Sequence, residues 1–153
     1  MRRARGFTLI EVMIVVVVIA LLAAIGYPSY REHIARGQRS QGQQFLSEVA
    51  QREEQFLLDR RQYTDVLGNG GLNITQPAMK YGAPTITLVA GPPAGFVICM
   101  DPVAGSALAT RNDGTICINS TGQRWRQPTG GNTAFDSASE CLWDDRSCPH
   151  KPF

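Results

Sequence analysis

Apolar residues are concentrated at the start of the chain and then recur at helical spacing. Val12 to Ile25 form an uninterrupted apolar run, and Phe7 to Ile10 extend it with Thr8 as a single polar interruption. This run is long enough to predict a membrane-spanning helix. From Ser29 to about Arg61, apolar residues recur in steps of three and four, as in an amphipathic helix: Phe45, Leu46, Val49, Ala50, Phe56 and Leu57.

Pro28 lies between these two helical patterns. Proline lacks the N–H that would bond to the carbonyl of Ala24, and Gly26 adds further backbone freedom. Because the helical pattern resumes at once, we predict one long, kinked helix from Phe7 to about Arg61. Its first part, residues 7–28, would lie in a membrane or filament core. Its second part, residues 29–62, would pack its apolar stripe against a sheet.

The remainder of the chain reads as a loop followed by strands. Residues 63–84 are rich in Gly, Asn, Thr and Pro, which predicts a surface connection. Candidate strands then follow with short links, with the fourth segment the weakest: Thr85–Ala90, Phe96–Met100, Thr115–Asn119 and Ala107–Thr110. Sequential strands of this kind predict an antiparallel meander that covers the helix. The expected fold is therefore α+β, with the sheet and a disulfide-bonded C-terminal region in residues 85–153.

The formal charge of +2 depends on three arginines ahead of the apolar run, namely Arg2, Arg3 and Arg5. If residues 1–6 are a basic leader that is removed, 12 basic residues remain against 13 acidic ones. A nearly neutral mature chain gives no argument for nucleic-acid binding from net charge.

Four cysteines lie beyond the apolar segment, at Cys99, Cys117, Cys141 and Cys148. Their even number predicts an oxidising compartment and two disulfides. They lack the close spacing of a structural zinc site. We favour Cys99–Cys117 with Cys141–Cys148, since both bridges are local, although four cysteines permit three pairings.

Glu11 lies inside the apolar segment, where a carboxylate is expensive. Insertion of an Asp at the centre of a membrane helix costs about 2.5–3.5 kcal/mol, and Glu should be similar. Cleavage after Gly6 would create an amino group at Phe7, four residues before Glu11. That amine, in the same helix or a neighbouring one, would neutralise the carboxylate. Glu11 therefore predicts self-association of processed helices.

Two stretches of the first helix carry a resemblance to a known family. Gly6-Phe7-Thr8-Leu9-Ile10-Glu11 resembles the class III leader junction of type IV prepilins, and Tyr27-Pro28-Ser29-Tyr30 resembles type IVa pilins. The resemblance implies the pilin fold, cleavage after Gly6 by a prepilin peptidase, and methylation of Phe7. It also implies that Glu11 and Pro28 act in filament assembly.

The stretch after the proline is most similar to minor pilins of the PilE kind. This resemblance implies a subunit that co-assembles in or primes a type IV pilus for twitching motility, adhesion or DNA uptake. A major pilin and a DNA-receptor pilin are the alternatives. The implied partners are other pilins, the prepilin peptidase and the inner membrane, where the precursor would be a single-pass protein with a periplasmic C-terminal domain before it enters the surface pilus.

The C-terminal segment Glu140-Cys141-Leu142-Trp143 resembles the Cys-Trp ending of such pilins. In the family this implies a bridge between Cys117 and Cys141, which would leave Cys99 with Cys148. The chain departs from the family pattern because it continues past Trp143.

Motifs for catalysis or cofactors are not found. His33 and His150 lie among charged or turn residues, and Asp144 and Asp145 lack the spacing of a calcium loop. We therefore expect no enzyme activity, no cofactor and no metal. The alternation of Arg124, Trp125 and Arg126 supports one binding hypothesis, since basic and aromatic side chains together bind DNA phosphates and bases. The competing interpretation is an ordinary exposed strand end.

Overall fold

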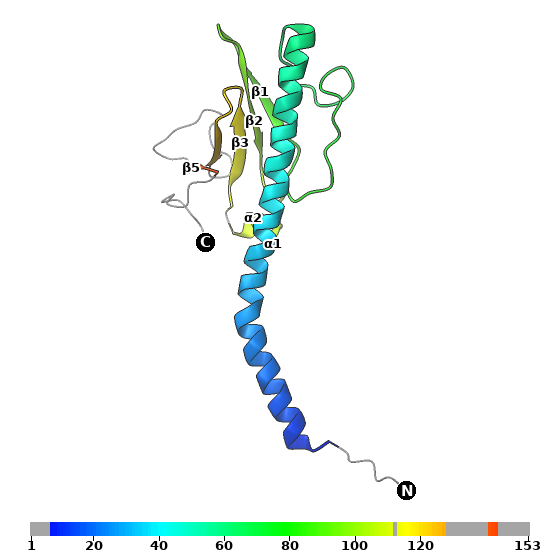
Figure 1. The fold of residues 1–153 in the computed structure, drawn as a ribbon, viewed down its shortest axis with the longest axis vertical. Coiled ribbons are helices and arrows are strands. Elements are labelled where there is room, and N and C mark those ends of the chain that lie inside the picture. Colours follow the sequence, from blue (N-terminus) through cyan, green and yellow to red (C-terminus); the bar gives the residue numbers. More distant parts are fainter. Residues whose placement is uncertain (1–6, 112, 128–140, 144–153) are drawn as a thin grey trace. The chain divides into compact units, whose positions relative to one another are not determined.

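The computed structural model describes residues 7–111, 113–127 and 141–143. The chain divides into two compact units, residues 1–36 and 37–153, and each is described by itself. Helix α1 runs through both units, and the remaining elements belong to the second (Figure 1). In chain order the elements are α1 (Leu9–Arg60), β1 (Thr85–Val89), β2 (Gly95–Met100), α2 (Ala107–Thr110), β3 (Thr115–Asn119), β4 (Arg124–Gln127) and β5 (Cys141–Leu142).

The first unit presents its apolar side chains to the surroundings. Phe7 is 84% exposed, and the large apolar residues from Leu9 to Ile25 are 48–78% exposed. Among the described residues, α1 is the one helix with a stretch long and apolar enough to cross a bilayer. A helix with this much exposed apolar surface requires lipid or other protein around it.

Thr8 caps the start of α1. Its hydroxyl oxygen accepts a hydrogen bond from the Glu11 backbone N–H at 3.3 Å, and its carbonyl accepts one from Val12 N–H at 3.3 Å. The spacing Thr8-x-x-Glu11 is that of a capping box, and an acidic residue in the first turn also interacts favourably with the helix dipole. Thr8 therefore starts the helix, and the Glu11 carboxylate lies in the first turn, where the helix dipole favours it.

Helix α1 continues through Pro28, as predicted, and is helical from Leu9 to Arg60. A bend at Pro28 remains a prediction. Beyond the last turn, Arg61 adopts a left-handed backbone conformation (φ 59°), and its N–H bonds to the carbonyl of Leu57 at 2.7 Å. This arrangement is a common way to end a helix and satisfy a terminal carbonyl.

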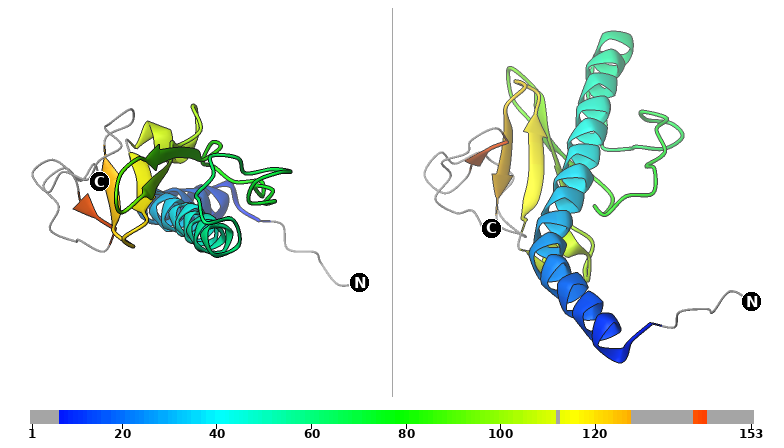
Figure 2. Two further views of the ribbon diagram at one scale, coloured as in Figure 1. Left: turned by 90° about the horizontal axis from the view of Figure 1, so that it is seen from above. Right: turned by 60° about the horizontal axis from the view of Figure 1, so that its bottom comes forward.

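The sheet of the second unit is an antiparallel meander, as predicted. Its five strands among the described residues lie in the order β1-β2-β3-β4-β5, and each pairs with the next in sequence. The second half of α1 lies along one face of the sheet (Figure 2). The strands predicted at 85–90, 96–100 and 115–119 are confirmed to within one residue.

One prediction about secondary structure was wrong, and one strand was missed. Residues 107–110 form the short helix α2 rather than a strand. The Ser106 hydroxyl accepts the N–H of Ala109 at 3.2 Å, and this N-cap starts a turn that buries Leu108. Strand β4 was not predicted, because two arginines in four residues hide the alternation of buried and less buried positions.

The core of the second unit lies between α1 and the sheet. From the helix it takes Phe45, Leu46 and Val49, all at most 4% exposed. Gly42 lies on the same face of α1. A Cβ atom at this position would come within 2.7 Å of Tyr81 Cδ2 and 2.9 Å of Ile116 Cδ1. The absence of a side chain at Gly42 therefore allows the helix to approach the sheet closely.

A disulfide joins Cys99 and Cys117, which face each other in the register of β2 and β3. This bond agrees with the local pairing favoured above. It excludes the pairing implied by the family resemblance, because that pairing gives Cys117 to Cys141 and Cys99 to Cys148. The physical reason is the meander, which brings the two strand cysteines opposite each other. Cys148 lies outside the described residues, so Cys141–Cys148 remains a prediction.

The close approach at Gly42 predicts different costs for the same substitution at two glycines of α1. Gly42→Ala should lower the free energy of unfolding by about 1–3 kcal/mol relative to Gly37→Ala, because Tyr81 and Ile116 must move. Gly37 has nothing within 4 Å of an added Cβ. Alanine there should stabilise the helix by up to about 1 kcal/mol. Urea unfolding of both variants in detergent would measure the difference, and equal stability would contradict the packing argument.

Candidate nucleic-acid interface

Strand β4 places Arg124, Trp125 and Arg126 in three different environments. Arg124 is exposed, Trp125 is fully buried, and the Arg126 side chain is 13% exposed. Successive side chains of a strand point to opposite faces of the sheet, so Trp125 cannot share a surface with its neighbours. The hypothesis that all three side chains contact DNA is therefore wrong for Trp125, and Arg126 has little surface to offer. Arg124 remains a candidate.

Trp125 belongs to a small core on the sheet face that carries the disulfide. It lies opposite Cys117 in the register of β3 and β4, and it packs with Val97, Cys99 and Cys117. Its indole N–H donates to Gln127 Oε1 at 3.3 Å. The side chain is thus a structural residue of the sheet.

Arg126 takes part in a buried ion cluster that connects the helix to the sheet. The Asp113 carboxylate is 5% exposed and accepts hydrogen bonds from Arg39 Nε at 2.8 Å and from Arg39 Nη2. Arg126 Nη1 lies 3.9 Å from Asp113 Oδ1. Burial, together with the nearby charge of Arg39, lowers the pKa of Arg126, while Asp113 opposes that shift. The cluster holds α1, the start of β3 and β4 together.

Arg124 lies over an aromatic ring that sequence analysis did not connect with it. Its guanidinium carbon is 5.4 Å from the ring centroid of Trp143, within the range of a cation–π interaction. Trp143 is fixed by two hydrogen bonds to β4. Its indole N–H donates to the carbonyl of Trp125 at 2.8 Å, and its backbone N–H donates to the carbonyl of Arg124 at 3.3 Å.

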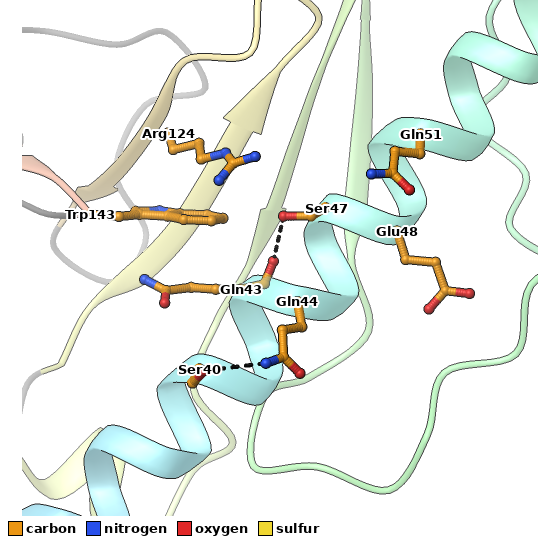
Figure 3. Close-up of a pocket in the computed structure, with 8 residues that line it drawn as sticks. All are labelled: Ser40, Gln43, Gln44, Ser47, Glu48, Gln51, Arg124 and Trp143. Carbon is orange, nitrogen blue, oxygen red and sulfur yellow. Dashed lines mark hydrogen bonds between the residues drawn. The ribbon is translucent and has the colours of Figure 1, made fainter.

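Arg124 and Trp143 form one wall of a groove of about 330 Å³, and α1 forms the other wall (Figure 3). The helix contributes a stripe of polar side chains, which we call the polar stripe: Ser40, Gln43, Gln44, Ser47, Glu48 and Gln51. The hydroxyl of Ser47 donates to the carbonyl of Gln43 at 2.8 Å, and Gln44 Nε2 lies 3.5 Å from Ser40 Oγ. The groove thus combines a cation with amide and hydroxyl groups.

The polar stripe carries a sequence signal that was overlooked. Each member has another member three or four residues away, so all six share one face of the helix. The apolar stripe of α1 has the same periodicity and was predicted from it. The polar stripe was missed because only the spacing of hydrophobic residues was considered. Trp143 gives no comparable signal, since its proximity to Arg124 depends on the pairing of β4 with β5.

A second groove, of about 270 Å³, borders the other edge of the polar stripe. It is lined by Gln41, Gln44, Phe45, Glu48 and the loop residues Pro77, Ala78 and Met79. Gln44 and Glu48 therefore line both grooves. Within the part of the chain that the structure describes, no group of three or more His, Cys, Asp or Glu side chains could hold a metal ion.

Among the residues that the structure describes, the other site residues that were predicted from the sequence line neither of the two grooves. Phe7, Glu11 and Pro28 belong to the first unit, where Phe7 and Glu11 are exposed. Gly6 lies outside the described residues, as do His150, Asp144 and Asp145. His33 is exposed on α1.

Two family models match the chain, and together they cover most of it. The family model described as "Type IV minor pilin ComP, DNA uptake sequence receptor" matches residues 28–121, which is more than half of the chain. The model of the prokaryotic N-terminal methylation motif matches residues 1–27. The second match covers the stretch that contains Gly6, Phe7 and Glu11.

Individual relatives match a shorter part. The type IV major pilin protein PilA of Myxococcus xanthus is 40% identical over 63 residues, which are 41% of this chain and 29% of PilA. The type IV major fimbrial protein FimA of Dichelobacter nodosus is 44% identical over 61 residues, covering 40% of this chain and 39% of FimA. The chain thus spans well under half the length of these relatives. No solved structure matches the chain significantly.

The buried ion cluster predicts that Asp113→Asn will be costly. The substitution removes the carboxylate that Arg39 and Arg126 share, so we expect the free energy of unfolding to fall by roughly 3 kcal/mol. Arg36→Gln is the control, because Arg36 and Glu32 form an exposed pair at 3.5 Å that should contribute less than about 1 kcal/mol. Urea unfolding at pH 7 would test both, and similar losses for the two variants would contradict this role of Asp113.

Proposed function

This chain belongs to the type IV minor pilin family of ComP, the DNA uptake sequence receptor, and from that membership we propose that it is a pilus subunit that binds DNA. The sequence alone favoured a minor pilin and kept the DNA receptor as an alternative. The family match now supports both roles in one protein. The structural feature that carries the DNA proposal is the exposed Arg124 beside the polar stripe of α1.

The filament role depends on the first unit. The methylation motif over residues 1–27 supports cleavage after Gly6 by a prepilin peptidase and methylation of the new N-terminal Phe7. The exposed apolar helix would hold the precursor in the inner membrane and later pack among other pilins in the pilus. Glu11 would then pair with the N-terminal amine of a neighbouring subunit in a medium that penalises unpaired charges.

We expect Glu11→Gln to leave membrane insertion intact but to reduce incorporation into pili. Glutamine keeps the side-chain shape and removes the charge that the amine requires. Incorporation is measured by immunoblotting of sheared filaments, with the membrane fraction as the reference. Thr8→Ala is the matched control, because it removes the helix cap and leaves the carboxylate. If Thr8→Ala reduces incorporation as much as Glu11→Gln, the role of Glu11 is confined to the helix start.

The DNA role depends on the groove of the second unit. An exposed arginine can contact a backbone phosphate, and glutamine and serine side chains can donate to and accept from base edges or phosphates. The ring of Trp143 supports the guanidinium of Arg124, which lowers the entropy lost when Arg124 binds. Glu48 in the same groove would repel phosphates, so we expect the backbone to lie on the Arg124 side.

The named relatives favour a second candidate for the filament role. Both are described as major subunits, PilA as a major pilin and FimA as a major fimbrial protein. A major pilin would form the bulk of purified pili, whereas a minor pilin would be a small fraction. Quantitative mass spectrometry of sheared pili would distinguish the two.

For DNA binding we expect Arg124→Ala to weaken affinity for all duplex sequences alike. Loss of one phosphate contact should make the slope of log affinity against log salt concentration less negative by about one. Fluorescence anisotropy of the mature protein in detergent would measure this slope between about 50 and 200 mM salt. Over that range, a protein with many phosphate contacts loses about 10³–10⁵-fold in DNA affinity. Arg60→Ala removes the same charge from the last turn of α1, outside the groove, and is the control. Equal effects of the two variants would reject the proposed site.

A further inference from the structure

Glu53 is a carboxylic acid in the interior of the second unit. It lies on α1, and its side chain is fully buried. Its Oε2 atom accepts a hydrogen bond from the backbone N–H of Thr64 at 3.2 Å. Its Oε1 atom is also buried and has no hydrogen-bond partner. A buried carboxylate with one bond and an unsatisfied oxygen is strongly destabilised when it is charged.

The charged groups that act on Glu53 are also acidic. Glu54 lies next to it on α1, and Asp65 lies on the segment that follows the helix. The third titratable neighbour is Tyr63, whose hydroxyl donates to Glu54 Oε1 at 3.2 Å and whose ring packs edge-on against Phe96 of β2, with centroids 5.0 Å apart. Glu53 thus interacts electrostatically with two acidic residues and with the phenol of Tyr63.

Burial, followed by the charges of Glu54 and Asp65, raises the pKa of Glu53 to about 7, although the Thr64 N–H opposes the shift. The ordinary value is 4.5. Because the folded pKa is raised, the closed arrangement, in which Glu53 is buried, is most stable below pH 4.5. It weakens as pH rises from 4.5 to 7 and changes little above that range.

We propose that Glu53 is a proton-dependent latch, which holds the segment after α1 against the helix when it is protonated and releases it when it is ionised. The segment that would be released begins after α1 and ends before Leu72. Leu72 is 5% exposed, and its N–H bonds to the carbonyl of Val66 at 2.9 Å. Opening would expose the carboxylate to water together with Tyr63 and Thr64. The latch thus makes this surface segment of the pilin responsive to external pH near neutrality.

The experiment measures amide hydrogen exchange at Thr64 in the full mature chain in detergent micelles, by NMR between pH 5 and pH 8. Glu53→Gln is the reference, because its amide oxygen still accepts the Thr64 N–H and it carries no charge. The ratio of the wild-type rate to the Glu53→Gln rate at each pH removes the intrinsic pH dependence of exchange. We expect this ratio to rise by about tenfold per pH unit up to pH 7 and then to level off.

Glu54→Gln is the matched control, since it removes the exposed neighbouring charge and should keep the pH dependence at Thr64. A constant ratio between pH 5 and pH 8 would overturn the proposal. It would also be overturned if the amide of Ile118 in β3 showed the same pH dependence, because the opening would then be global. Should Glu53→Gln fail to fold, a carbon-13 titration of the Glu53 carboxyl in the wild type decides. A midpoint near 7 supports the latch, and one near 4.5 overturns it.

Discussion

The ion cluster around Asp113 determines how the helix, the sheet and the groove are arranged. Arg39 reaches Asp113 from α1 and Arg126 reaches it from β4, so a single carboxylate at the start of β3 connects three elements. The register pairs Ile116 with Arg126 and Ile118 with Arg124, so the two arginines share the sheet face that packs on α1. The pairing of β3 with β4 places Arg124 two residues from Arg126 on the same face, beside the polar stripe. The buried arginine of the ion cluster and the exposed arginine of the groove thus belong to one face of one strand.

The helix and the first three long strands could be predicted because each depends on local periodicity. Apolar residues repeat every three or four positions in α1, and β-branched and aromatic residues cluster in β1, β2 and β3. Strand β4 and its partner Trp143 could not be predicted, since their environments depend on pairing between distant segments. The exposure of Arg124 was foreseen, whereas the burial of Trp125 was not. Glu53 lies four residues after Val49 on the buried face of α1, but its burial was missed because it is charged, as are its exposed neighbours Arg52 and Glu54.

Glu11 illustrates how a local and an intermolecular role can fall on the same residue. In hydrocarbon the Glu11 carboxylate is costly, and an N-terminal amine would neutralise it. The bond from Glu11 N–H to Thr8 Oγ1 is a backbone bond that does not involve the carboxylate, but a carboxylate in the first turn interacts favourably with the helix dipole. A contribution of this kind is typically a fraction of the cost of a charge in hydrocarbon, about 0.3–1 kcal/mol. The dipole interaction therefore offsets part of the penalty without removing the need for a positive partner.

The two grooves beside α1 have a common boundary, because Gln44 and Glu48 line both of them. A side chain can orient its amide or carboxylate toward one groove at a time. Any molecule that engages these two residues from the Arg124 side deprives the opposite groove, next to Met79, of the same hydrogen-bonding groups. The two grooves thus share two side chains of one helix face, and a molecule bound in one of them would compete for the hydrogen-bonding groups of the other.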